Sequence, residues 1–323
     1  DAVRSRGLGD VYKRQAIFLL FLNYSFSQET VFELLNSKET GVDFNNIIED
    51  KKEHNILLYA NYYGGGGVGI ADFDNDGLQD IYFGGNLVSD KIYKNLGDFK
   101  FADKTINSGI VDNGSWSSGI TIADVNNDGL VDIYVSKELY DYKPDLRKNK
   151  LYINKGDFTF EESSKNWGVD VSARTRHAVF FDYNNDGYLD LYLLNQPPNP
   201  GSYSKFFGAD LTLLEYSLQL FKNTGNNSFI DVTKEAGLNR TGFPNSVVAS
   251  DLNQDGFIDL YVANDFDAPD FLYYNNGDGT FSYETESSLK HTSFYSMGVD
   301  SADINNDGEL DIMVVDMTAE AVS

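Results

Sequence analysis

The sequence predicts an all-β protein, a β-propeller of four-stranded antiparallel blades, and two repeated motifs carry this prediction. The first is an acidic loop, DFDNDGLQD from Asp72, which returns from Asp124, Asp182, Asp251 and Asp303. The second is a hairpin between these loops, in which an aromatic strand, a turn rich in Asn, Gly and Asp, and a strand led by phenylalanine follow one another. Four short strands in each period of about 50 residues are typical of a propeller blade.

Each period is predicted to contain strands A to D in order. Strand A enters the acidic loop, and strand B leaves it as DIYF or a close variant. Strands C and D form the hairpin, and the phenylalanines that lead strand D are Phe101, Phe160, Phe229 and Phe281. Five acidic loops and four hairpins predict four complete blades and the first two strands of a fifth, with strands of about 4 to 6 residues. No helix is predicted apart from a turn around residues 210–218.

Each acidic loop has the spacing of a calcium site. A single DxDxDG match is equally compatible with a solvated turn, but five copies, each with aspartate at position 9, favour a metal site. We expect oxygen atoms from the side chains at positions 1, 3, 5 and 9 and from the carbonyl at position 7 to surround one ion, while the glycine at position 6 permits the turn. Hard oxygen ligands favour Ca²⁺ over zinc or copper. An EF-hand is excluded because position 12 of the first loop is Phe83 and both flanks are strand-like.

We therefore predict about five Ca²⁺ ions, one per DxDxDGxxD-type loop. The first loop is expected to bind most tightly, because it has Asp74 where the other loops have asparagine. The predicted metal ligands are Asp72, Asp74, Asp76, Leu78 and Asp80; Asp124, Asn126, Asp128, Leu130 and Asp132; Asp182, Asn184, Asp186, Tyr188 and Asp190; Asp251, Asn253, Asp255, Phe257 and Asp259; and Asp303, Asn305, Asp307, Glu309 and Asp311.

These motifs resemble the FG-GAP/VCBS repeat family, whose propellers are similar to the head of integrin α subunits and carry calcium in such loops. The stretches GGGGVGIADFDNDGLQDIYFGGN, VANDF, HTSFYSMGVDSADINNDG and DIMVVDM further resemble exported bacterial proteins that are similar to cartilage acidic protein. Those proteins often carry a C-terminal ASPIC/UnbV segment, which this chain lacks. The resemblance implies an intact ring of about seven blades. Since the last repeat stops after strand B, we expect an incomplete ring, truncated at the C-terminus.

The composition of the chain argues against several classes of partner and of catalytic or metal site. The chain has 25 Lys and Arg against 50 Asp and Glu, a net charge of −25. This charge argues against nucleic acid and anionic membrane surfaces as partners. The chain has no cysteine, which excludes disulfides, thiol catalysis and zinc-thiolate sites. Because the repeat runs through the chain, we expect one propeller domain over residues 28–323.

The N-terminus is set apart from this domain. Residues 16–27 have the apolar run and the small residues of a signal peptide, with cleavage after Ser27, and are too short to span a bilayer. We therefore expect export, to the periplasm, the cell surface or the medium. Residues 1–15 have no initiator methionine and resemble a translated adapter scar, or else form a basic n-region. Phe32 then leads an orphan D strand, expected to complete the last blade or alternatively to cap the first.

A partner is expected on the face opposite the calcium loops. Antiparallel order places the A–B and C–D turns at one end of each blade and the B–C and D–A loops at the other. Long B–C loops at residues 136–150 and 195–219 extend that second end, and long loops on a rigid scaffold often carry binding sites. The aromatic residues expected to be exposed there, with one arginine, are Tyr140, Tyr142, Tyr203, Phe206, Phe207, Trp116 and Arg176. The alternative is that these aromatics fold back as loop packing.

Two functions remain open from the sequence. The first is an exported calcium-binding module for adhesion, or for binding a polysaccharide or protein ligand, with no membrane span. The second is a polysaccharide-degrading hydrolase or lyase on the same scaffold, which a carboxylate pair about 5–9 Å apart outside the loops would favour. The three histidines, His54, His177 and His291, precede A strands and could converge, but no catalytic residue is assigned. The YYGGGG stretch is explained by close backbone approach.

Overall fold

The computed structural model describes residues 32–59, 61–112, 114–140, 143–197, 216–266 and 268–317. The chain divides into two compact units, residues 1–39 and 40–323. All the strands described below lie in the second unit.

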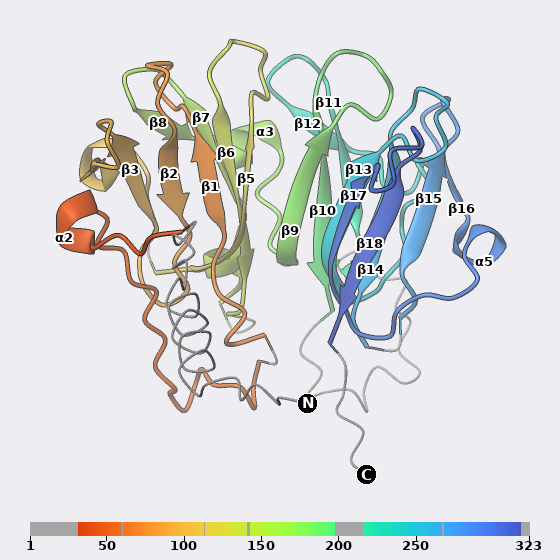
Figure 1. The fold of residues 1–323 in the computed structure, drawn as a ribbon, viewed down its shortest axis with the longest axis horizontal. Helices are drawn as coiled ribbons and strands as arrows, with labels where there is room; N and C mark the ends of the chain where they lie inside the picture. The colour runs from red at the N-terminus through yellow and green to blue at the C-terminus, as the bar shows by residue number, and fades with distance from the viewer. Residues whose placement is uncertain are drawn as a thin grey trace, which may run out of the picture. The chain divides into compact units, whose positions relative to one another are not determined.

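The described residues form four four-stranded sheets and one two-stranded sheet, each antiparallel with strands in chain order (Figure 1). This confirms the all-β class and the predicted order of strands A to D. The strands have 3 to 8 residues: every D strand has three, shorter than expected, and the A strands after the first have seven or eight, longer than expected. The first two sheets consist of β1 (Val68–Ala71), β2 (Asp80–Phe83), β3 (Lys91–Asn95) and β4 (Phe101–Asp103), and of β5 (Trp116–Ala123), β6 (Asp132–Glu138), β7 (Lys150–Asn154) and β8 (Phe160–Glu162). The others consist of β9 (Arg174–Phe181), β10 (Asp190–Gln196), β11 (Gln219–Asn223) and β12 (Phe229–Asp231), of β13 (Pro244–Ser250), β14 (Asp259–Asn264), β15 (Phe271–Asn275) and β16 (Phe281–Tyr283), and of β17 (Ser296–Ala302) with β18 (Asp311–Asp316).

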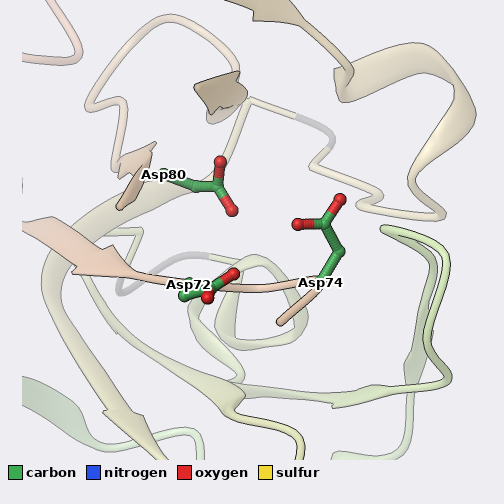
Figure 2. A group of neighbouring side chains, drawn as sticks. All are labelled: Asp72, Asp74 and Asp80. Atoms are coloured by element: carbon green, nitrogen blue, oxygen red, sulfur yellow. The ribbon is translucent and has the colours of Figure 1, made fainter. Parts of the chain in front are cut away.

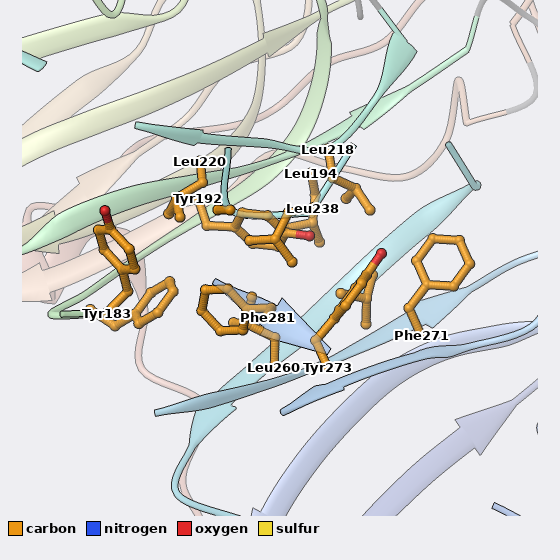
Figure 3. Close-up of a cluster of buried hydrophobic side chains, with 13 residues drawn as sticks. Tyr183, Tyr192, Leu194, Leu218, Leu220, Leu238, Leu260, Phe271, Tyr273 and Phe281 are labelled. Atoms are coloured by element: carbon orange, nitrogen blue, oxygen red, sulfur yellow. The ribbon is translucent and has the colours of Figure 1, made fainter. Parts of the chain in front are cut away.

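The hydrophobic cores lie between neighbouring sheets. One core joins the third and fourth sheets through Tyr192 and Leu194 on one side and Leu260 and Tyr273 on the other (Figure 3). Similar cores join the first sheet to the second, the second to the third, and the fourth to β17 and β18. In addition, the first strand of each sheet contacts the first strand of the next. Sheets packed face to face around their first strands form a β-propeller arrangement.

Short helical turns, which the sequence interpretation missed, follow three of the D strands. They are η1 (Thr105–Asn107), α3 (Ser164–Trp167) and α5 (Thr285–Ser288); two further turns are α2 (Ser37–Thr40), before β1, and η2 (Pro144–Arg147), between β6 and β7. The glycine after η1, Gly109, has φ +81°, and a Cβ on it would lie 2.3 Å from the carbonyl oxygen of Phe160. Gly41, after α2, stands in the same relation to Phe101. Only glycine fits, because it has no side chain and tolerates positive φ.

The orphan D strand predicted at Phe32 is not observed. Residues 32–36 form no strand, and the Phe32 side chain is 89% exposed. This segment resembles the segments that contain the D strands only in the turn that follows, since α2 and Gly41 correspond to η1 and Gly109. A strand forms only where a partner offers ladder hydrogen bonds, and none of the described strands pairs with this segment.

Candidate metal centre

Strand register places each acidic loop in the same way. The last residue of strand A pairs with the aspartate at position 9, as Ala71 does with Asp80. The same pairing recurs for Ala123 with Asp132, Phe181 with Asp190, Ser250 with Asp259 and Ala302 with Asp311. Each loop therefore spans positions 1 to 8 between two paired strands, which fix both of its ends.

Backbone hydrogen bonds then give all five loops one shape. In the first loop, the Asp72 carboxylate accepts hydrogen bonds from the Asp76 N–H at 3.0 Å and the Gly77 N–H at 2.7 Å. The Asp76 carboxylate accepts one from the Leu78 N–H at 2.9 Å. The residue at position 4 has positive φ, 56° at Asn75, and the glycine at position 6 has 88° at Gly77. The same bonds recur in the other four loops, so the loop geometry is a property of the motif.

The first loop brings three carboxylates together. One oxygen of each of Asp72, Asp74 and Asp80 lies within 4.8 Å of the others, and Figure 2 shows the three groups directed toward a common space. Asp74 Oδ1 is buried there and has no hydrogen-bond partner. A buried oxygen without a donor is costly, and a bound cation would satisfy it. An all-oxygen set of this kind fits Ca²⁺.

Asp76, a predicted ligand, does not belong to this trio, because its carboxylate is used by the Leu78 N–H and by Lys94. Across the described part of the chain, no second trio of acidic or histidine side chains has this spacing. The other loops have an amide at position 3, whose oxygen accepts a hydrogen bond from the N–H at position 5. For example, Asn126 Oδ1 accepts from the Asp128 N–H at 3.0 Å. Their side-chain ligands and the five carbonyls at position 7 therefore remain predictions.

The aspartate at position 9 has a second role that the sequence did not reveal. Asp132 accepts hydrogen bonds from the Val125 N–H in its own loop at 3.0 Å and from the Asn154 N–H on β7 at 2.8 Å. Asp80, Asp190 and Asp259 make the same pair of bonds. Burial raises the pKa of Asp132 and of Asp190 to about 7, although these hydrogen bonds act in the opposite direction. A cation in the loop would favour the charged carboxylate.

The asparagine that ends each C strand was also missed. Asn154 on β7 donates to the carbonyl of Val131 in its own sheet at 3.1 Å and to that of Phe73 in the preceding sheet at 2.8 Å. Asn223 bonds Val125 and Asn275 bonds Tyr183 of the preceding sheet in the same way, each at position 2 of the loop. The signal in the sequence is the asparagine that precedes every hairpin turn.

A second set of amides links the loops to one another. Asn75 donates to the Gly129 carbonyl at 3.1 Å, so position 4 of one loop bonds position 6 of the next. The same link joins Asn127 to Gly187, Asn185 to Gly256 and Gln254 to Gly308. The five loops thus form one continuous hydrogen-bonded series.

Two lysines of the described residues contact carboxylates of the acidic loops. Lys94 on β3 contacts the carboxylate of Asp74, and its Nζ lies 2.9 Å from Asp76 Oδ2. The hydrogen bond from Lys94 lowers the pKa of Asp76. Lys222, at the matching position on β11, lies 3.2 Å from Asp186 Oδ2 in the third loop.

At the opposite end of the sheets, two of the predicted partner-binding aromatics are buried, so the expectation that they would be exposed is wrong. Trp116 is 0% exposed and Tyr140 is 8% exposed. Trp116 packs edge-on against Tyr59, with ring centroids 5.6 Å apart, and against Tyr62 at 5.4 Å. These tyrosines come from a segment without a repeat motif, so their packing over Trp116 could not be predicted from the repeat pattern. The other predicted aromatics, Tyr142, Tyr203, Phe206 and Phe207, lie outside the described residues.

Arg176 is engaged within the fold. It occupies a β-bulge in β9, which turns a side chain out of the ladder. Its Nη1 lies 3.4 Å from Oε2 of the fully buried Glu138, which also accepts a hydrogen bond from the Tyr59 hydroxyl. A Cβ on Gly64 would lie 2.9 Å from its guanidinium, so the glycine-rich stretch makes room for this side chain.

The three histidines have separate surroundings. His54 packs against the Tyr140 ring, His177 packs against Gly119 on the neighbouring strand β5, and His291 is exposed. No group of potential metal ligands in the described ranges includes a histidine. The predicted convergence of these residues is therefore not supported.

The described residues contain no helix that is both long enough and apolar enough to cross a membrane.

Several solved structures are similar to this chain. A lectin of Agrocybe aegerita that recognises non-reducing terminal N-acetylglucosamine is 18% identical, with 76% of this chain and 59% of that chain covered and a TM-score of 0.43. The V. cholerae biofilm matrix protein Bap1 is 16% identical, with 69% and 30% covered and a TM-score of 0.35. A fructofuranosidase of Schwanniomyces occidentalis is 12% identical, with 82% and 55% covered and a TM-score of 0.39. This chain therefore spans about 30% to 59% of the length of these proteins.

No curated protein matches the sequence. The FG-GAP-like repeat family matches residues 54–135, 143–193, 209–262 and 251–314, which is most of the chain and includes all five acidic loops. These matches agree with the sheets and loops described above, and the chain belongs to the FG-GAP-like repeat family.

Proposed function

We propose that this chain is an exported β-propeller module whose acidic loops bind Ca²⁺ and whose opposite end binds a polysaccharide or protein partner. The observation that carries the calcium proposal is the buried, unpartnered Oδ1 of Asp74 beside Asp72 and Asp80. Four further loops with the same backbone hydrogen bonds extend the proposal from one ion to five. When bound, the ion supplies charge neutralisation and holds strands A and B together.

The residues that would hold the ion are those at positions 1, 3, 5, 7 and 9. The position-1 aspartate has both oxygens hydrogen-bonded to the loop backbone, as Asp72 does, which orients the carboxylate. The position-9 aspartate is held by the N–H at position 2 and by the C strand, as Asp80 is. Because these side chains are already fixed by the fold, ion binding would cost little side-chain entropy.

Calcium removal is the direct test of this function. We expect chelator to lower the melting temperature of the purified chain and added Ca²⁺ to restore it, because an ion that binds only the folded state stabilises it by about 2.7 kcal/mol at one hundred times its Kd. Calorimetry should detect heat on Ca²⁺ addition. Mg²⁺ should replace it poorly, because it prefers a smaller octahedral site.

Asp74→Asn is the matched variant for the first loop, because it converts position 3 to the residue found in the other four loops. It should reduce the calcium-induced rise in melting temperature, whereas Asp98→Asn, in the β3–β4 turn, should leave that rise unchanged. An unchanged melt with chelator in the unmodified chain would contradict the calcium proposal.

The partner proposal is tested separately. The unmodified chain should retain polysaccharides or proteins on an array in the presence of Ca²⁺. Replacing Tyr203, Phe206 and Phe207 together with alanine should weaken that retention and leave the calcium-dependent melt nearly unchanged. Loss of stability with unchanged retention would show that these aromatics pack the fold.

A further inference from the structure

The residue before the C-strand asparagine differs among the sheets. It is a lysine in two of them, Lys94 on β3 and Lys222 on β11. The same position holds Ile153 on β7 and Tyr274 on β15. Because strand C lies beside strand B, this position lies next to the acidic loop of its own sheet.

The two lysines reach into the loops. Lys94 contacts Asp74, a member of the carboxylate trio in Figure 2, and also lies 2.9 Å from Asp76 Oδ2. Lys222 lies 3.2 Å from Asp186 Oδ2 in the third loop. The second and fourth loops show no lysine contact in the described part of the chain. An ammonium group therefore contacts carboxylates of the first and third loops, and a Ca²⁺ ion would compete with it for these carboxylates.

Beside the first loop there is space into which the Lys94 side chain can move. A cavity of about 360 Å³ lies beside it, with Lys104, Asn107, Asp157 and Phe158 in its walls. Lys94 Nζ lies 6.0 Å from the Phe158 ring centroid. The Asp157 carboxylate in the same wall offers the ammonium group a second counter-ion. Lys94 thus has room to leave the loop without entering an apolar environment.

We infer that Lys94 and Lys222 are built-in counter-cations that compete with Ca²⁺, so that the chain carries two classes of loop. This inference rests on the proposed calcium function and specifies its regulation. The lysine-held loops, the first and the third, need displacement of an ammonium group before an ion binds. The open loops, the second and the fourth, do not. This reverses the order expected from Asp74 alone, which places the first loop as the tightest.

The physical reason is charge. A doubly charged ion and an ammonium group a few ångströms apart repel each other even at the effective dielectric of a protein surface. Removing the lysine should therefore tighten Ca²⁺ binding at that loop by about tenfold or more. The metal-free protein should become less stable, because Asp74 and Asp76, or Asp186, lose their counter-ion.

The test uses Ca²⁺ alone as the probe and the whole chain, in titration calorimetry and in thermal melts with chelator. Lys94→Met and Lys222→Met should each add one ion to the tight class, and the double variant should add two. Each should melt lower than the unmodified chain in chelator and show a larger rise with Ca²⁺. Tyr274→Lys, at the matching position on β15 beside the fourth loop, should remove one tight ion.

Lys155→Met is the control, because Lys155 follows a C strand but pairs with Glu161 at 3.0 Å, outside the loops. It should leave the tight class unchanged. Lys94→Gln is a second variant in case Lys94→Met misfolds, which near-ultraviolet circular dichroism would reveal. Calcium binding that is the same in all these chains would overturn the inference and leave the proposed calcium function standing. Absence of binding in every chain would overturn both.

Discussion

An amide at the end of strand C joins each of the second, third and fourth sheets to the sheet before it. Asn154 Nδ2 bonds the Phe73 carbonyl of the preceding sheet at 2.8 Å, and both groups are buried. Asn95, at the same position on β3, bonds only Gln79 of its own sheet through its amide nitrogen. These two asparagines therefore differ in the bond between sheets and in burial, since Asn154 is buried and Asn95 is half-buried.

Asn154→Ala should cost more stability than Asn95→Ala. The first variant leaves two carbonyls without their donor, one of them in the next sheet, and each lost buried partner costs about 1–3 kcal/mol. Urea unfolding of both variants in saturating Ca²⁺ measures the difference. Equal losses would show that the bond between sheets contributes nothing to stability.

His177 gives the protein an acid-sensitive contact. Its ring packs against Gly119 on β5, and burial, with the positive charge of Arg176, lowers its pKa below the ordinary value near 6.5. The unfolded chain therefore binds a proton at a higher pH than the folded chain. The stability that His177 contributes is complete above about pH 6.5 and is lost as the pH falls below it, by at most about 1.4 kcal/mol per pH unit.

His177→Gln should flatten this part of the stability profile. Urea unfolding at pH 7.5, 6.5 and 5.5 in saturating Ca²⁺ measures it, with His291→Gln on an exposed side chain as the control. A decline toward pH 5.5 that is as steep in His177→Gln as in the unmodified chain would contradict the assignment.

At the scale of single elements, the close packing of the segment before β1 against β5 depends on glycine. A Cβ on Gly67 would lie 2.5 Å from the Ile120 nitrogen of β5, whereas one on Gly65 would meet nothing within 4 Å. Gly67→Ala must therefore push two strands apart, and overpacking of this kind costs about 1–3 kcal/mol or more. Gly65→Ala pays only for its positive φ of 78°, about 1 kcal/mol.

Thermal melts should show a lower melting temperature for Gly67→Ala than for Gly65→Ala. Equal melting temperatures would show that the close approach of the chain at Gly67 to β5 contributes nothing to stability.

The strands and hairpins were predictable because their signals are local. Asp, Gly and Asn stand at fixed offsets, and the register of each loop follows from them. The short turns such as α3 were missed because four residues are too few to show a helical period. The burial of Trp116 and Tyr140 was missed because Tyr59, Tyr62 and their neighbours contact them across the fold, and no motif marks that segment. The shape of the acidic loops was predicted well. The lysine contacts were not predicted, because they depend on which residue of β3 or β11 lies beside the loop in the folded sheet.

For the molecule as a whole, the excess of negative charge is a source of self-repulsion. The net charge of −25 places many carboxylates close together, and self-repulsion of this kind destabilises a compact state. Salt shortens the range of the repulsion from about 10 Å at 0.1 M to about 3 Å at 1 M.

In chelator, the melting temperature should therefore rise as NaCl increases from 0.05 to 0.5 M, by about 1–2 °C for each kcal/mol of repulsion relieved in a domain of this size. In saturating Ca²⁺ the same salt increase should have a smaller effect, because the bound ions already neutralise part of the charge. Scanning calorimetry at both conditions measures this. A metal-free melt that falls with salt would contradict it.

The C-strand amides between sheets also bear on the order in which the sheets dock during synthesis. In each bond of this kind the donor, such as Asn223, lies in the later sheet, and the acceptor, such as Val125, lies in a loop made earlier. As the chain leaves the ribosome, each new hairpin therefore finds its docking point already synthesised. The nascent protein would grow by adding sheets to a folded N-terminal template, and a circular permutation that separates donor from acceptor would disturb this sequence of events.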